Sequence, residues 1–137
     1  MSEEVLAIHT MALATEDDVL ALRRRVRDIA EMRQFDTFAL AAIMTAASEL
    51  GRNVLVHGGG GNATIEELSD GRRVGIRITF VDSGPGIPDI PRVLAGGYST
   101  ARSMGLGLSG SKRLVDVFDL QSKVGEGTRI TVTKWKR

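Results

Sequence analysis

The chain of 137 residues contains no cysteine. Without thiols it forms neither a disulfide nor a thiolate-bound zinc site, and this composition is typical of proteins in a reducing compartment. The N-terminus, MSEEVLAIHTM, has acidic residues where a signal peptide has basic ones. We find no apolar run that approaches the length of a membrane span. The sequence therefore predicts a cytoplasmic protein with no membrane partner.

An excess of charge of one sign is also missing. Lysine and arginine number 18, aspartate and glutamate 17, and the net charge is +1. Such a chain has no overall field that attracts nucleic acid, and the basic tail TKWKR is too short to supply one. The hydrophobic content of 42% and the charged content of 26% are those of an ordinary globular protein. We expect residues 1–137 to form one domain.

Proline is scarce, and its three residues all lie between Ser83 and Met104, where several glycines accompany them. We expect a long loop there, and long loops within compact domains are usually functional. Elsewhere, apolar periodicity predicts regular elements. The expected strands are 5–13, 63–68, 73–82, 121–124 and 129–135, and the expected helices are 16–32, 38–57 and one that follows Gly110 through Leu114, Val115 and Phe118.

This order of elements predicts the fold class. Strand, two helices, two strands, loop, helix and two strands are typical of an α+β protein. We expect a two-layer sandwich in which helices cover one face of a mixed, largely antiparallel sheet. Thr15 and its following acidic residues favour the start of the first helix, and either Asp36 or Thr37 favours the start of the second. The run GGGG, residues 58–61, ends that helix.

The stretch GLGLSG, residues 105–110, has the letters of a dinucleotide fingerprint, G-x-G-x-x-G. The residues before it, GGYSTARSM, do not form a strand, so a Rossmann loop is excluded. Ser111 stands where a P-loop has lysine, which argues against that loop too. Two interpretations remain. The glycines lead into a helix N-terminus that binds phosphate, or they form a tight turn for backbone reasons alone.

Glu49 and Asn53 are four residues apart in the second expected helix, so they lie on one face of it. Their neighbours are mostly apolar, and polar residues in such a helix need an explanation. An acid and an amide placed in this way can activate a hydroxyl group and hold a magnesium ion. The alternative is a solvated polar face with no chemical role.

Two further motifs follow. Asp82 ends the most apolar expected strand, and Gly84 and Gly86 flank a proline just after it. A carboxylate in this place can accept a hydrogen bond from the exocyclic amine of adenine, and glycines let a flat base approach the backbone; the alternative is an ordinary turn that begins with aspartate. The stretch GEGT, residues 125–128, is in isolation a hairpin turn.

Together and in this order, the four motifs resemble those of the GHKL nucleotide-binding family, which includes gyrase, MutL and the histidine kinases. ELGRN matches its N box, DSGPGI its first glycine box, GLGL its second and GEGT its third. The resemblance covers residues 46–132, most of the chain. It implies the Bergerat ATP-binding fold, with ATP and Mg²⁺ as the bound groups.

The resemblance also implies roles for individual residues. Glu49 corresponds to the general base, Asn53 to a ligand of Mg²⁺, and Asp82 to the acceptor of the adenine amine. Residues 91–104 correspond to a lid over ATP, in which Arg102 is a candidate contact of the γ-phosphate. The implied nucleotide-binding set is Asn53, Asp82, Gly84, Gly86, Ile87, Arg102, Gly105, Leu106, Gly107, Leu108 and Thr128.

Within that family, SELGRN, GGYST and GSKRLVD resemble the small serine/threonine kinases of bacterial stress and sporulation responses, above all the switch kinases of the stressosome. The resemblance implies a STAS-domain protein substrate and a downstream phosphatase or other output regulator. Neither histidine suits the role of phosphoacceptor, and His57 is expected as a helix C-cap. The alternatives are an anti-sigma factor kinase of the same fold and a non-catalytic, ATP-gated binding module.

Overall fold

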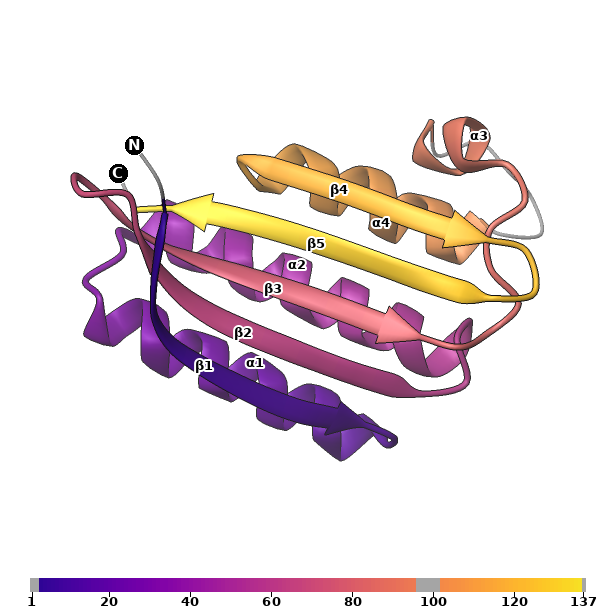
Figure 1. Ribbon diagram of the computed structural model, residues 1–137, viewed down its shortest axis with the longest axis horizontal. Coiled ribbons are helices and arrows are strands. Elements are labelled where there is room, and N and C mark those ends of the chain that lie inside the picture. The colour runs from indigo at the N-terminus through magenta and orange to yellow at the C-terminus, as the bar shows by residue number, and fades with distance from the viewer. Residues whose placement is uncertain (1–2, 96–101, 137) are drawn as a thin grey trace.

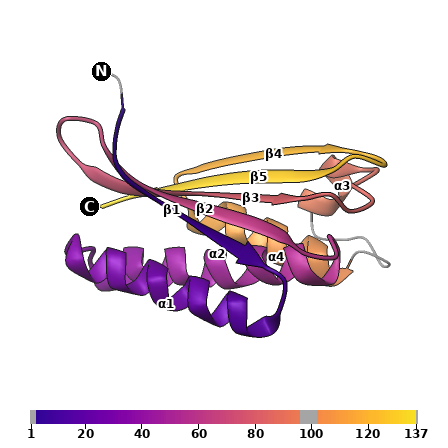
Figure 2. The ribbon, with the colours of Figure 1, turned by 60° about the horizontal axis from the view of Figure 1, so that its bottom comes forward.

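The computed structural model describes residues 3–95 and 102–136, which form two layers (Figures 1 and 2). One layer is a five-stranded sheet, and the other consists of helices on one face of that sheet. The elements are β1 (Glu4–Leu13), α1 (Glu16–Met32), α2 (Thr37–Val56), β2 (Gly61–Ser69), β3 (Val74–Asp82), α3 (Ile90–Leu94), α4 (Arg102–Leu114), β4 (Val117–Lys123) and β5 (Gly127–Trp135).

The strands lie in the order β1-β2-β3-β5-β4, and every neighbouring pair among them is antiparallel. The predicted α+β sandwich is confirmed, with a sheet that is antiparallel throughout the described residues rather than mixed. Strand β3 occupies the centre. At its last residue, Asp82 pairs with Gly61 on one side and with Thr128 on the other. Three segments distant in sequence therefore meet at this end of the sheet.

Both long helices begin at the capping residues that the sequence favours. The Thr15 hydroxyl accepts a hydrogen bond from the Asp18 amide at 3.2 Å, and the Asp18 carboxylate accepts one from the Thr15 amide at 3.0 Å. This reciprocal pair is a capping box. Hydrogen bonds from the amides of Ala14 and Thr15 lower the pKa of Asp18. Asp36, one of the two residues proposed for the second cap, accepts from the Ala39 amide at 2.8 Å.

Helix α2 is the central helix, packed between α1 and α4 over the sheet (Figure 2). Its length and hydropathy would suffice for a membrane span, so the expectation that no such run exists was wrong. In the structure, however, Ile43 and Leu50 of α2 are fully buried against apolar strand residues such as Phe80. Burying each such side chain stabilises the fold by about 1.5–3 kcal/mol. The place of α2 in the core therefore explains its apolar character.

Three predicted elements differ in the structure. Residues 83–104 are not a continuous loop, because they contain α3 and the first turn of α4. Helix α4 includes the glycines of GLGLSG instead of following them, and it ends at Leu114. Phe118, expected in that helix, lies in β4, which begins four residues earlier than expected, at Val117. Leu114 and Phe118 have helical spacing, whereas Phe118 and Leu120 alternate as in a strand; pairing with β5 decided in favour of the strand.

A partly buried ion-pair cluster attaches the end of α1 to β1 and β2. Glu67, in β2, is only 6% exposed, and its carboxylate accepts a hydrogen bond from Arg33 Nε at 2.8 Å. His9 Nε2, in β1, lies 2.7 Å from the same carboxylate. Burial raises the pKa of Glu67, but the hydrogen bonds from His9 and Arg33 outweigh it, and the net pKa is lowered. Glu67 is therefore charged in the folded protein at neutral pH.

Candidate functional site

Asp82, at the end of β3, is enclosed by glycine backbone. A Cβ atom on Gly58, just past α2, would overlap the Asp82 side chain, and one on Gly127 would overlap the Asp82 carbonyl. A Cβ on Gly61 would likewise strike the carbonyl of Val81. Glycine is required where backbone approaches this closely. The glycines after α2 and at the start of β5 therefore let three chain segments converge on one carboxylate.

The Asp82 carboxylate is held in one orientation. Its Oδ1 accepts a hydrogen bond from the Gly84 amide at 2.9 Å, and Oδ2 has no hydrogen-bond partner among the residues that the structure describes. Gly84 lies against the chain that ends α2, where its own Cβ would come within 2.8 Å of the Gly58 Cα. An ionised carboxylate accepts hydrogen bonds only, so Oδ2 is suited to a ligand N–H.

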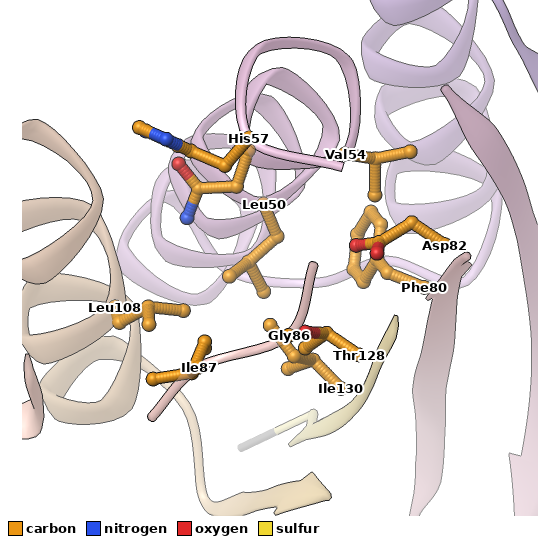
Figure 3. A pocket seen from close by; sticks show the side chains of 11 residues that line it. Leu50, Val54, His57, Phe80, Asp82, Gly86, Ile87, Leu108, Thr128 and Ile130 are labelled. Carbon is orange, nitrogen blue, oxygen red and sulfur yellow. The ribbon is translucent and has the colours of Figure 1, made fainter. Parts of the chain in front are cut away.

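A narrow pocket opens beside this carboxylate (Figure 3). Its empty space, including the part open to solvent, is about 390 Å³. Most of its lining is apolar and polar atoms are few, an arrangement suited to a flat base with a polar edge. Burial lowers the pKa of His57, so its imidazole is neutral at neutral pH. The lining residues are Leu50, Asn53, Val54, His57, Phe80, Asp82, Gly86, Ile87, Leu108, Thr128 and Ile130.

Ser122 connects three parts of the pocket wall, although the sequence analysis did not identify it. Its hydroxyl lies 2.9 Å from the Thr128 hydroxyl and 3.0 Å from the Gly127 carbonyl oxygen, and it accepts from the Ile87 amide at 2.8 Å. Ser122 and Thr128 are opposite each other in the β4–β5 register. The GEGT turn could have indicated this partner, because a short hairpin fixes which residues face each other.

Gly86 brings the loop after β3 beneath that hairpin. Its φ of +80° lies in the region that glycine favours, and its Cβ would strike the Lys123 carbonyl. The adjacent amide of Gly125 donates to the Pro85 carbonyl at 2.9 Å. The first and third glycine motifs therefore form one joined wall of the pocket.

Glu49 and Asn53 lie on the side of α2 that meets α4. A Cβ on Gly107 of α4 would lie 3.2 Å from Glu49 Oε2 and 3.5 Å from Asn53 Nδ2. Glycine thus permits α4 to pack directly over both polar side chains. Asn53 also lines the pocket described above, so it connects the base-sized pocket to the carboxylate of Glu49.

Asn53 Nδ2 is buried and has no hydrogen-bond partner among the residues that the structure describes. An orphaned buried amide costs about 1–3 kcal/mol, and a ligand that satisfies it recovers part of that cost. A half-turn of the side-chain amide exchanges Oδ1 and Nδ2, so either atom can face this space. Among the described residues no group of three or more acidic or histidine side chains can hold a metal ion. The residues present fit Mg²⁺ all the same, because Mg²⁺ commonly takes one or two protein ligands beside phosphates and water.

The second glycine motif is located differently from the prediction. Gly105 and Gly107 lie inside α4, which begins at Arg102, and not in a turn before a helix. The expected lid falls partly on residues 96–101, outside the described part of the chain, and the side chains of Arg102 and Leu106 are outside it too. The structure brings together the predicted residues Glu49, Asn53, Asp82, Gly84, Gly86, Ile87, Gly107, Leu108 and Thr128.

Comparisons with known proteins agree with this geometry. Residues 40–137 match the family of histidine kinase-, DNA gyrase B- and HSP90-like ATPases. The serine/threonine-protein kinase RsbT of Bacillus subtilis is 45% identical over 125 residues, 91% of this chain and 94% of that protein. The anti-sigma F factor of Thermoanaerobacter sp. is 29% identical over 102 residues, 70% of each chain.

Two solved structures share the fold. The crystal structure of the RsbU and RsbW domains of Rv1364c from Mycobacterium tuberculosis has a TM-score of 0.65 at 21% identity; all of this chain aligns with 33% of that longer one. The SiaB–SiaC complex from Pseudomonas aeruginosa has a TM-score of 0.56 at 12% identity, covering 96% of this chain and 90% of that one. The chain therefore belongs to the histidine kinase-, DNA gyrase B- and HSP90-like ATPase family and, within it, to the RsbT type of serine/threonine-protein kinase.

Proposed function

We propose that this kinase uses Mg²⁺-bound ATP to phosphorylate a serine or threonine of a STAS-domain protein and thereby acts as a switch in bacterial stress signalling. The proposal depends on one observation above all. Glu49 lies beside Asn53, and Asn53 lines the pocket that contains the Asp82 carboxylate. A candidate base, a candidate metal ligand and a base-sized pocket are therefore contiguous.

Asp82 and Thr128 are proposed to orient the adenine. The free Oδ2 of Asp82 accepts a hydrogen bond from the exocyclic amine, while Gly84 holds the other carboxylate oxygen at 2.9 Å. Thr128, fixed by Ser122 at 2.9 Å, supports the same edge, directly or through water. Ile87 and Leu108 cover the faces of the base. These contacts bind the nucleotide but move no proton.

Glu49 is proposed as the general base. It accepts the proton of the substrate hydroxyl as that oxygen forms its bond to the γ-phosphorus and the bond to the ADP oxygen breaks. Mg²⁺, held in part by Asn53, would supply charge neutralisation at the phosphates. The resemblance gives Gly105 and Gly107 the role of offering backbone N–H groups to those phosphates. Because both residues lie inside α4, we propose instead that their lack of a side chain lets the phosphates approach this helix, with Arg102 as a further candidate contact. Positioning and electrostatics provide most of the catalysis in such transfers.

The relatives support a protein substrate. RsbT is named a serine/threonine-protein kinase, and its 45% identity exceeds the 29% identity of the anti-sigma F factor. This difference favours the switch kinase over the anti-sigma factor kinase. After transfer, the kinase is proposed to engage a downstream phosphatase or other output regulator. The absence of cysteine is in accord with a cytoplasmic location.

The decisive experiment combines the purified chain with radiolabelled ATP, Mg²⁺ and the STAS-domain protein encoded nearest to it. We expect label on serine or threonine of that protein with the wild type and none with Glu49→Ala. If no protein is labelled, and if partner binding depends on ATP in both the wild type and Glu49→Ala, the chain is instead a non-catalytic ATP-gated module. Stable capture of a sigma factor would favour the anti-sigma factor kinase.

A further inference from the structure

The arginines of α1 and its C-cap fall into two groups. Arg33 and Arg25 are committed to the fold, since Arg33 Nε binds Glu67 at 2.8 Å and Arg25 Nη1 lies 3.2 Å from His9 Nδ1. Arg23 and Arg24 are exposed and have no hydrogen bond or ion pair with any residue that the structure describes. Within the described part of the chain neither guanidinium group is engaged, so both are available to a partner.

These two arginines border a hollow between α1 and α2, which lie side by side in the helical layer (Figure 2). Leu20, Arg23, Arg24 and Arg27 have the spacing i, i+3, i+4 and i+7, so they form one stripe along α1. Met44 of α2 completes the lining, and the hollow has about 500 Å³ of empty space, including the part open to solvent. The hollow is therefore a groove with both apolar and cationic walls.

The apolar part of this groove is accessible. The Leu20 side chain is 52% exposed, although its helix neighbours Val19 and Leu22 are at most 4% exposed. Arg27 is only loosely engaged, since its Nε lies 3.8 Å from the nearest Asp28 oxygen and 3.7 Å from that of Glu31. Exposed ion pairs of this kind contribute little, so Arg27 can exchange them for another carboxylate.

The charge of the groove defines its partner. The whole chain carries a net charge of only +1, so the arginines are a local concentration and not part of a general attraction to nucleic acid. Guanidinium groups bind carboxylates in a bidentate manner, and Leu20 and Met44 offer an apolar contact between them. The complementary surface is a protein segment with both acidic and apolar side chains.

Helix α2 connects this groove to the catalytic site. It contributes Met44 to the groove and Glu49 to the active site, and five residues of helix separate these two by about 7.5 Å along the axis. At 100° per residue, the two side chains lie on different flanks of α2. A protein bound in the groove can therefore extend over α2 toward Glu49 without blocking the nucleotide pocket.

We propose that the groove lined by Leu20, Arg23, Arg24, Arg27 and Met44 is the docking site for an acidic, amphipathic segment of the protein that this kinase phosphorylates. The inference rests on the proposed function, because it takes the STAS-domain substrate as the partner. It assigns recognition of the protein to α1 and α2, and chemistry to the opposite flank of α2.

The test compares Arg23→Glu/Arg24→Glu with Arg72→Glu/Lys136→Glu. Both double variants change the net charge equally, and the control residues lie near the β2–β3 turn and at the end of β5. Affinity for the purified STAS-domain protein is measured by calorimetry at two salt concentrations, beside ATP affinity and the KM for the protein substrate. Leu20→Ala serves as a second variant that keeps the charge.

We expect Arg23→Glu/Arg24→Glu to raise both the Kd and the KM for the protein about tenfold or more, to flatten the salt dependence, and to leave ATP affinity unchanged. Leu20→Ala should weaken binding without altering the salt dependence, and the control pair should behave as the wild type. The proposal is overturned if the groove variants keep the wild-type affinity for the partner, or if the control pair weakens binding equally. It is also overturned if the wild type does not bind the protein. A groove variant that loses binding to duplex DNA but binds the partner normally would also overturn the proposal.

The two hypotheses fail in different ways. If partner binding depends on Arg23 and Arg24 but the wild type transfers no phosphate, the kinase function toward this protein is refuted and the docking proposal stands. If the groove variants show normal phosphate transfer and normal partner affinity, the docking proposal is refuted and the proposed kinase function stands.

Discussion

Gly107 of α4 lies directly over Glu49 of α2, so that a Cβ atom on the glycine would come within 3.2 Å of Glu49 Oε2. The same Cβ would be 3.5 Å from Asn53 Nδ2, a buried atom that has no hydrogen-bond partner within the described part of the chain. One helix contact therefore involves the proposed base, the proposed metal ligand and the second glycine motif together.

Replacing this glycine tests the contact. Gly107→Ala should push the Glu49 carboxylate aside by a few tenths of an ångström and lower both Mg²⁺-dependent ATP affinity and phosphotransfer, although alanine is the better helix former by about 1 kcal/mol. Gly110→Ala is the matched control, because its Cβ would meet no atom within 4 Å. It should stabilise the domain and preserve activity. Thermal unfolding and nucleotide titration report the two effects, and equal activity of both variants would contradict the proposed role of Gly107.

Asp82→Asn should weaken ATP binding about tenfold to hundredfold in a folded protein. The amide has one acceptor oxygen in place of two, and Gly84 already uses a carboxylate oxygen at 2.9 Å. A buried unmatched polar group costs about 1–3 kcal/mol, which corresponds to a tenfold to hundredfold loss of affinity. Calorimetric titration with ATP measures this loss, with circular dichroism as the control for folding. Wild-type affinity would refute the adenine assignment.

Glu49→Ala and Asn53→Ala should have different effects. Removal of the base should slow phosphotransfer by about 10²–10⁴ and leave ATP binding nearly intact. Loss of Asn53 should weaken nucleotide binding in Mg²⁺ as well as transfer, because a metal ligand is lost. Titrations with and without Mg²⁺, beside single-turnover transfer, separate the two. If both variants lost only transfer, Asn53 would not be a metal ligand.

Ser122→Ala should weaken ATP binding without contacting ATP. The variant loses the hydroxyl that lies 2.9 Å from Thr128 and 2.8 Å from the Ile87 amide. An unpaired buried amide costs about 1–3 kcal/mol, so both stability and nucleotide affinity should fall. Thr128→Ser, which keeps the hydroxyl, should retain most of the affinity. A stability loss in Ser122→Ala with unchanged ATP affinity would limit Ser122 to a structural role.

Glu67 should make stability depend on pH. Its pKa is lowered in the folded protein, so its contribution is present above the unfolded pKa of about 4.5 and is lost as the pH falls through the lower folded value. Glu67→Gln should lower stability by about 1–3 kcal/mol at pH 7 and reduce its decline on acidification. Urea unfolding from pH 7 to pH 3 tests this, with the exposed Glu4→Gln as control. An unchanged pH profile in Glu67→Gln would show that other carboxylates govern acid unfolding.

Much of the fold and of the candidate site could be predicted from the sequence alone. Caps such as Thr15 and apolar periodicity located the long helices and strands, because these signals act within one or two turns of chain. The order of polar and glycine motifs indicated the ATP-binding family, since residue types such as Glu49, Asn53 and Asp82 carry their chemistry wherever the backbone brings them together.

Tertiary packing decided the rest. Phe118 lies in β4 because pairing with β5 prevailed over its helical spacing from Leu114. The contact of Gly107 with Glu49 exists because α4 packs against α2. The hydrogen bond from the Ile87 amide to the Ser122 hydroxyl joins two residues that are 35 positions apart. The groove beside Arg23 and Arg24 likewise requires two helices in contact. Such features depend on residues far apart in sequence, whose proximity no local pattern encodes.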